Sequence, residues 1–138
     1  MFRNALVALG ILALTAAPGF ARGLEQAPPP APYKKVSTLV PRPSFLPGIG
    51  ILYVDPKTLP EGPWLAYDRE GKLVSTIYMI LLKDFDQHQN LVDLAAPGGP
   101  VDHVSLYYNA GHPGVPEPHY HIVLSSGPPV RAAAMSGL

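Results

Sequence analysis

Histidine is the residue type whose spacing in this sequence points most clearly to chemistry. Four of the five histidines lie between His103 and His121, a span of nineteen residues. His119 and His121 are separated by one residue, so in a β-strand both side chains point to the same face, with Cα atoms about 7 Å apart. Neutral imidazoles without thiolates suit zinc, copper or nickel better than calcium or magnesium. The pattern predicts a transition-metal site formed by His103, His112, His119 and His121.

Whether His103 and His112 can join this site depends on how the segments that contain them fold against the strand of His119 and His121. His103 belongs to an earlier apolar segment, and antiparallel pairing would bring it beside His119 and His121. His112 lies in the proline-rich connection of residues 109–118. Three protein ligands and a water molecule would form an open zinc site of the kind that supports hydrolysis. The alternative is that the histidines lie on a solvated or hydrogen-bonded surface of the strand pair.

Other catalytic chemistries lack their sequence patterns. No Gly-x-Ser-x-Gly occurs, so the nucleophile of a serine hydrolase is not indicated. Gly48-Ile49-Gly50 precedes an apolar strand pattern and not the helix of a dinucleotide-binding loop. Asp84 and Asp86 are explained by helix capping. We therefore predict no catalytic residue and no nucleotide, flavin or haem cofactor; zinc or another transition metal is the one cofactor that the sequence leaves open.

The composition indicates one small domain of short strands and loops. The chain has 138 residues, with 18 prolines and 13 glycines, and 47% of its residues are hydrophobic. Ten basic residues balance ten acidic ones, so no broad basic surface exists for nucleic acid. There is no cysteine, so stability must come from the core, from a metal or from self-association. A homo-oligomer is therefore expected.

The first residues have the pattern of an export signal. Arg3 is followed by an apolar run over residues 5–17, which is too short to span a bilayer, and the small residues Gly19 and Ala21 stand at the positions that usually flank a cleavage site. We expect residues 1–21 to be a signal peptide that is cleaved near Ala21. The mature protein would be periplasmic or extracellular, with no transmembrane segment.

The remaining chain divides into three parts. Residues 22–46 are rich in proline and predict an extended arm that wraps the surface or docks on a partner. Residues 47–126 predict a single β-rich domain, and residues 127–138 a flexible tail.

The expected fold class is mainly β, or a β-rich α+β fold, with a small antiparallel sheet or barrel-like sandwich and at most one short helix. Residues 84–94 predict that helix, capped by Asp84. Asp68 to Gly71 predict a hairpin turn. The apolar stretch of residues 72–82 indicates burial on both faces of one strand. The predicted strands are Ile51–Val54, Trp64–Tyr67, and residues 72–82, 101–108 and 120–125.

The order of several short motifs resembles an uncharacterised family of small exported bacterial proteins, a domain of unknown function. The resemblance covers residues 47–126, about 80 residues. The motifs that carry it are Pro47-Gly48-Ile49-Gly50, the segment from Tyr53 to Pro63, Tyr78-Met79-Ile80, Val101-Asp102-His103-Val104, Gly111-His112-Pro113 and Pro118-His119-Tyr120.

This resemblance implies a set of metal ligands that the present sequence has largely replaced. The family pattern has an early His, a Glu before Tyr-Met, and a last strand that reads Pro-His-Tyr/Phe-Asp-x-His. His119 keeps the first His of that strand, and His121 stands where the Asp would be. The resemblance therefore implies a lost or remodelled metal site. Aliphatic residues stand at the other three positions and imply an apolar pocket lined by Leu52, Ile77 and Val123.

Together these observations favour an exported, non-enzymatic small β domain that binds a small apolar ligand or self-assembles. The alternative is a histidine-based transition-metal-binding protein or a metal-dependent hydrolase.

Overall fold

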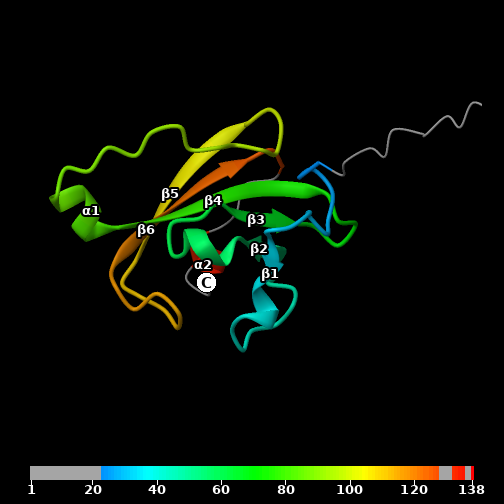
Figure 1. The fold of residues 1–138 in the computed structure, drawn as a ribbon, viewed down its shortest axis with the longest axis horizontal. Helices are drawn as coiled ribbons and strands as arrows, with labels where there is room; N and C mark the ends of the chain where they lie inside the picture. Colours follow the sequence, from blue (N-terminus) through cyan, green and yellow to red (C-terminus); the bar gives the residue numbers. More distant parts are fainter. Residues whose placement is uncertain (1–22, 128–131, 136–137) are drawn as a thin grey trace, which may run out of the picture.

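A computed structural model describes residues 23–127, 132–135 and 138, so the predicted signal peptide lies outside the described residues. The fold is one antiparallel sheet in the order β1-β2-β3-β4-β6-β5 (Figure 1). This confirms the mainly β fold class. The strands are β1 (Lys34–Lys35), β2 (Ile51–Val54), β3 (Trp64–Tyr67), β4 (Leu73–Leu81), β5 (His103–Asn109) and β6 (His119–Ser125). Two 3-10 turns, η1 (Val36–Thr38) and η2 (Pro56–Thr58), and two short helices, α1 (Leu82–Asp86) and α2 (Ala132–Met135), connect or flank them.

The strands largely follow the hydrophobic pattern of the sequence. β2 and β3 have the predicted bounds, and β4, β5 and β6 differ from theirs by one or two residues at an end. β4 is buried on both faces, as its apolar run predicted, because it lies between β3 and β6 in the middle of the sheet. Gly71 has a φ of 82° in the predicted turn between β3 and β4. β1 was not predicted, because two adjacent lysines show no alternation of polar and apolar side chains.

One face of the sheet carries the main core. Alternate side chains of β2, β3, β4 and β6 point to this face, and residues from the connecting segments cover them. The sheet contributes Leu52, Val54, Trp64, Ile77, Met79, Leu81 and Val123, and the cover contributes Val36, Ile49, Val115, Met135 and Leu138. The candidate histidines of β6 lie on this same face.

The proline-rich segment wraps the sheet. On the second face, Leu24 packs against Leu65, Tyr67 and Leu73, and the Tyr67 hydroxyl donates a 2.7 Å hydrogen bond to the Leu24 carbonyl. Farther along, β1 pairs with β2, and Val36 enters the main core. In this structure the segment therefore wraps the surface of the sheet. Leu73 reaches the second face because a register shift between Ala66 and Tyr67 breaks the alternation.

The helix after β4 is shorter than predicted. α1 ends at Asp86, and its N-cap position is Leu81, so the prediction of a helix over residues 84–94 capped by Asp84 is wrong. His88 and Asp93 have φ values of 53° and 57°, which a right-handed helix cannot contain. The segment runs along the second face, where the Tyr78 hydroxyl donates a 2.7 Å hydrogen bond to the Ala95 carbonyl.

The C-terminal residues that the structure describes are not a trailing tail. Ala132–Met135 form α2, and Met135 and Leu138 are buried in the main core. The expectation of a flexible tail over residues 127–138 does not hold for these positions. Burial of these two large apolar side chains stabilises the position of the segment on the core. The composition of the segment did not indicate this contact. None of the helices in the described part of the chain is long and apolar enough to cross a membrane.

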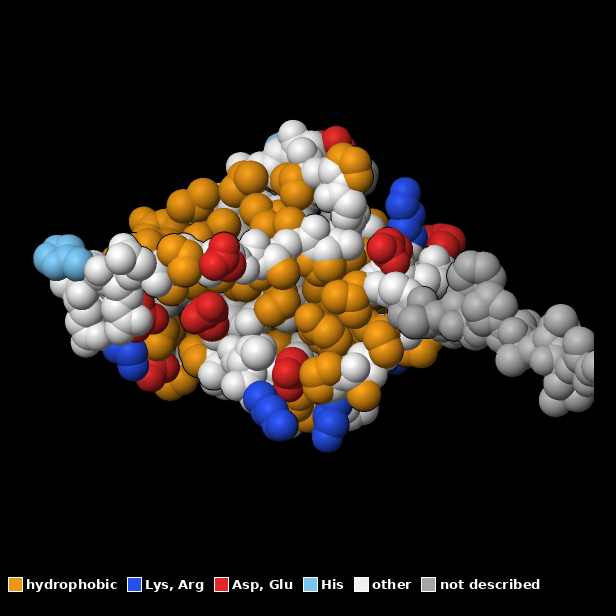
Figure 2. Space-filling model, turned by 45° about the horizontal axis from the view of Figure 1, so that its top comes forward, with side chains coloured by type: hydrophobic (Ala, Val, Ile, Leu, Met, Phe, Trp, Pro, Cys, Tyr) orange, Lys and Arg blue, Asp and Glu red, His pale blue; other side chains and the backbone are white. Residues whose placement is uncertain are grey.

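β5 is an edge strand with an exposed apolar face. Val104, Leu106 and Tyr108 are 54%, 60% and 57% exposed on the second face of the sheet. Hydrophobic side chains cover a broad area of the molecular surface in the view of Figure 2. Contiguous apolar patches of this kind are characteristic of interaction surfaces.

Candidate functional site

His119 and His121 lie side by side on the core face of β6. Their register partners on β4 are Leu81 and Met79, whose side chains belong to the main core. Both histidines are fully buried. The alternation of strand side chains predicted their shared face, and the ring centroids are 4.7 Å apart with the rings nearly perpendicular.

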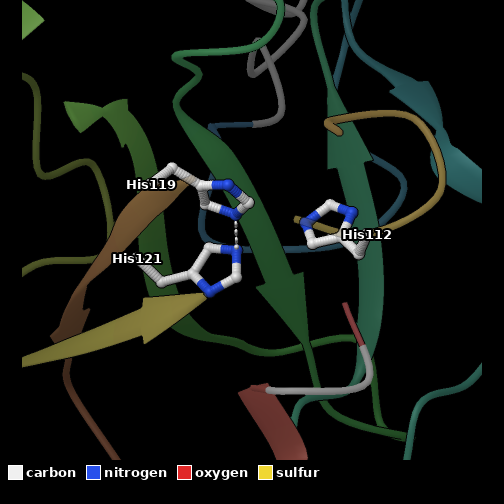
Figure 3. A group of neighbouring side chains, drawn as sticks. All are labelled: His112, His119 and His121. Atoms are coloured by element: carbon white, nitrogen blue, oxygen red, sulfur yellow. Dashed lines mark hydrogen bonds between the residues drawn. The ribbon is translucent and has the colours of Figure 1, made fainter. Parts of the chain in front are cut away.

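His112 approaches this pair from the connection between β5 and β6. The connection closes into a tight turn, in which the His112 and Val115 backbones exchange hydrogen bonds of 2.9 and 3.0 Å. Val115 is buried in the main core and anchors the turn over the sheet. Gly111 has a φ of 125° and donates a 2.9 Å hydrogen bond to the Asn109 side chain. The connection thus folds back over the sheet and directs the His112 ring towards β6 (Figure 3).

The three imidazoles converge closely enough to share one ion. One ring nitrogen of each of His112, His119 and His121 lies within 4.8 Å of the others. The His112 ring is stacked on His121, with centroids 5.6 Å apart, and stands edge-on to His119 at 4.9 Å. We refer to these three residues as the histidine trio.

Burial keeps members of the trio uncharged. Desolvation lowers the pKa of His121 to about 3, and the neighbouring His119, His112 and Arg42 contribute to this shift. The pKa of His112 is also lowered, chiefly by desolvation. Neutral imidazole is the form that binds metals.

The hydrogen bonds of the trio determine which nitrogens carry protons. His119 Nδ1 lies 2.7 Å from the Glu117 carbonyl, and His112 Nδ1 lies 3.1 Å from the Pro113 carbonyl. A carbonyl only accepts, so both rings donate from Nδ1, and in the neutral form each has a lone pair on Nε2. His119 Nε2 lies 3.1 Å from His121 Nε2, so His121 is the donor of that hydrogen bond and its Nδ1 has a lone pair. His112 Nε2 and His121 Nδ1 are buried without hydrogen-bond partners.

His103 is not part of this cluster. It lies opposite Ser125, six residues along β6 from His119, at the other end of the strand pair. The prediction that pairing would bring His103 beside His119 and His121 is therefore wrong. His103 shares a cross-strand row with Ser125 and Ser75, and each of the three has a buried side-chain atom without a hydrogen-bond partner. Neither serine was predicted to belong to a site.

A mainly apolar cavity of about 430 Å³ adjoins the trio at His112. Leu52 lines it, as predicted, but Ile77 and Val123 do not. These two residues are completely buried register partners in the central strands, and both belong to the main core. Trp64, Met79 and Leu81 also line the cavity and were not predicted to do so, although they share the core face with Leu52. Arg42 was not predicted either, because the segment around it shows no hydrophobic periodicity. The lining includes Val36, Leu39, Val40, Arg42, Leu52, Val54, Leu59, Trp64, Met79, Leu81, Lys83, His112 and Glu117.

Comparisons with known proteins place the chain among hypothetical proteins. The family model TTHB210-like, described as hypothetical protein TTHB210, matches residues 68–108. The crystal structure of hypothetical protein TTHB210 from Thermus thermophilus is similar, with a TM-score of 0.54 and 46% sequence identity. The match covers 62% of this chain and 84% of that chain. No curated protein matches.

These matches show that the chain is a member of an uncharacterised family. With 46% identity over most of the related chain, this protein belongs to the TTHB210-like family.

Proposed function

We propose that this protein binds a transition metal ion, zinc being well suited, through His112, His119 and His121. The observation that carries the proposal is the convergence of three buried imidazoles, one nitrogen of each within 4.8 Å of the others. The apolar run of residues 5–17 supports export, so that binding would occur outside the cytoplasm.

The chemistry of the trio fits a metal better than a purely structural cluster. A buried lone pair without a donor costs about 1–3 kcal/mol, and two such lone pairs face the interior here. A metal ion bound through the Nε2 atoms would accept the lone pair of His112. The Nε2 atoms of His119 and His121 are 3.1 Å apart, close to the roughly 3.3 Å between two nitrogens on tetrahedral zinc with bonds of about 2.0–2.1 Å.

Backbone carbonyls already orient two of the three rings for this role. The Glu117 and Pro113 carbonyls accept hydrogen bonds from His119 Nδ1–H and His112 Nδ1–H, and such contacts fix the tautomer in established metal sites. Binding through Nε2 of His121 would move its proton to Nδ1. Three protein ligands leave a fourth position for water or a ligand, which is the basis for the hydrolytic alternative.

The experiment that tests the proposal is the metal content of protein purified without a nickel column. We expect about one transition-metal ion per chain, removed by a strong chelator and restored by added zinc. His103→Ala is the matched control, because His103 is also a strand histidine but lies outside the trio. Metal-free protein that also fails to take up zinc, copper or nickel would refute the proposal.

Gly111 gives a further prediction about the position of His112. A Cβ at Gly111 would lie against the Pro116 carbonyl, and its φ of 125° strains any other residue. Gly111→Ala should therefore displace the turn and weaken zinc affinity by about tenfold or more, since such strain costs about 1–3 kcal/mol. Zinc affinity is measured by competition with a chromogenic chelator.

Gly114→Ala is the control for that variant. Gly114 also has a positive φ, of 95°, but a Cβ there meets no atom within 4 Å. The zinc affinity of Gly114→Ala should therefore fall less than that of Gly111→Ala. Equal affinities in the two variants would show that the backbone at Gly111 does not position His112.

A second candidate function is the binding of a small apolar ligand. The cavity of about 430 Å³ supports it, because most of its lining residues are apolar and its volume is in the usual range for ligand sites. The two candidates are compatible, since His112 belongs both to the trio and to the cavity wall.

Self-association of two copies through β5 also belongs to the proposal. β5 is at the end of the strand order, and Leu106 in its middle is 60% exposed. Leu106→Lys should lower the solution mass to that of a single chain, as measured by light scattering. Val92→Lys, at an exposed apolar residue outside the strands, should leave the mass unchanged. A wild-type protein with the mass of one chain would refute self-association.

A further inference from the structure

β5 pairs with another strand on one side only. It is at the end of the strand order, where β6 is its neighbour. In an antiparallel strand, the N–H and C=O of one residue point to the same side, and those of the next residue point to the other side. The register therefore decides which residues of β5 bond to β6 and which direct their backbone groups away from the sheet.

One hydrogen bond beyond the end of β6 fixes this alternation. The Ser126 N–H donates a 3.1 Å hydrogen bond to the Val74 carbonyl on the β4 side. Even-numbered residues of β6 therefore face β4, and odd-numbered residues face β5. The β5 residues in register with the latter are also odd-numbered: His103, Ser105, Tyr107 and Asn109. Val104, Leu106 and Tyr108 thus direct their N–H and C=O groups outward.

The outward side of β5 is open to another strand. In the part of the chain that the structure describes, no backbone group bonds to Val104, Leu106 or Tyr108 on that side. Natural edge strands are commonly protected from pairing by lysine, by other charged residues or by proline. The sequence of β5, HVSLYYN, contains no lysine, no acidic residue and no proline. β5 is therefore a template on which a further strand can form.

A second copy of β5 fits this edge in one register. Antiparallel pairing about a two-fold axis at Leu106 places Leu106 opposite Leu106 of the second copy, and Val104 opposite Tyr108. All outward N–H and C=O groups of the three residues are then bonded on both strands. A slip of two residues would set Val104 or Tyr108 opposite a residue outside β5. A slip of one residue would reverse the faces of the sheet.

The side chains favour the same register. Val104 opposite Tyr108 is a β-branched and aromatic cross-strand pair, which stabilises antiparallel sheets. Val104, Leu106 and Tyr108 are 54%, 60% and 57% exposed in the single chain, so they are accessible to a second copy. The Tyr108 ring is edge-on to Tyr120, with centroids 5.8 Å apart. Pairing would thus join the apolar faces of the two copies into one.

We propose that two copies of this chain pair through β5 about a two-fold axis at Leu106 and join their six-stranded sheets into one continuous sheet. This inference rests on the self-association through β5 proposed above, to which it adds the register and the symmetry. It differs from a stacking of the two apolar faces, which would need no hydrogen bond between backbones.

Leu106→Pro tests the backbone contact. Proline lacks the N–H, and it is tolerated on an edge strand where that N–H faces solvent, so the single chain should fold. We expect the dissociation constant of the dimer to rise at least about a hundredfold, because the two central hydrogen bonds are lost. Leu106→Val is the matched control: it keeps the N–H and an apolar side chain, and should change the constant less than about tenfold. Light scattering over a dilution series measures both.

Single-cysteine variants report the register, because the sequence contains no cysteine. Leu106→Cys should form a disulfide-linked dimer with the metal-free oxidant diamide, since the two Cα atoms would be about 5.5 Å apart. Val104→Cys should cross-link at least about tenfold more slowly, because about 13 Å of strand would separate its two copies. Co-expressed Val104→Cys and Tyr108→Cys chains should cross-link to each other. Val92→Cys, at a residue 71% exposed outside the strands, is the control for random collision.

The outcomes separate the register from self-association itself. A wild-type protein with the mass of one chain would overturn both. An oligomer in which Leu106→Cys cross-links no faster than Val92→Cys would overturn the pairing through β5 at Leu106 and leave self-association standing. Equal dissociation constants of Leu106→Pro and Leu106→Val would do the same. If Leu106→Pro does not fold, the cysteine variants decide the question.

Discussion

Zinc is expected to raise the melting temperature of the wild-type protein by about 15 °C and to leave that of His119→Ala/His121→Ala unchanged. A ligand that binds only the folded state, at about a thousandfold excess over its dissociation constant, adds about 4 kcal/mol to the free energy of unfolding. For a domain of this size, each kcal/mol corresponds to about 4 °C. Removal of two of three ligands leaves one imidazole, so the shift should disappear. The measurement is thermal unfolding by circular dichroism with zinc or with chelator.

The comparison is made within each variant, because both histidines are buried and their removal alone will lower stability. The quantity of interest is the zinc-induced shift and not the absolute melting temperature. His103→Ala should keep the full shift, since His103 is at the other end of the strand pair. A shift that survives in the double variant would mean that zinc binds elsewhere.

Ile77→Ala should lower the free energy of unfolding by about 2–5 kcal/mol, the cost of truncating a completely buried aliphatic side chain. Ile77 lies in the central strand β4, between Trp64 on β3 and Val123 on β6. These neighbours are held by the sheet and cannot collapse into the space that the truncation leaves. Urea denaturation measures the change.

Val92→Ala is the control for that variant, because Val92 is 71% exposed and its truncation should cost no more than about 0.5 kcal/mol. The result also bears on the pocket that the family resemblance implied. A loss below about 1 kcal/mol in Ile77→Ala would indicate that Ile77 borders open space, since a filled core gives the larger cost. A larger loss agrees with its place in a filled core.

Local patterns in the sequence were sufficient for most of the sheet. β2 and β3 were predicted to the residue, because short apolar runs end at Asp55-Pro56 and at the turn that contains Gly71. The shared face of His119 and His121 followed from a spacing of two residues. The predicted helix after β4 was too long. The apolar residues among positions 91–94 have a helix-like spacing, but His88 has a positive φ, which ends the helix before them.

Contacts between distant segments were not encoded in any local pattern. The register of β5 on β6 depends on how residues 110–118 fold, and it places Asn109, not His103, opposite His119. The wrapped segment and α2 contribute Val36, Met135 and Leu138 to the core, although proline and alanine give no periodic signal there. Their positions follow from burial against a sheet that must already exist.

The sequence by itself determined the antiparallel β class, the positions of β2 to β6, and the placement of two histidines on one face. Each of these depends on the two-residue period of a strand and on residues close together in the chain. The tertiary structure alone decided that His112 completes a trio from which His103 is excluded, and that Arg42 and Trp64 border one cavity. The reason is that turn conformation and strand register bring these residues together, and both are set by packing over the whole sheet.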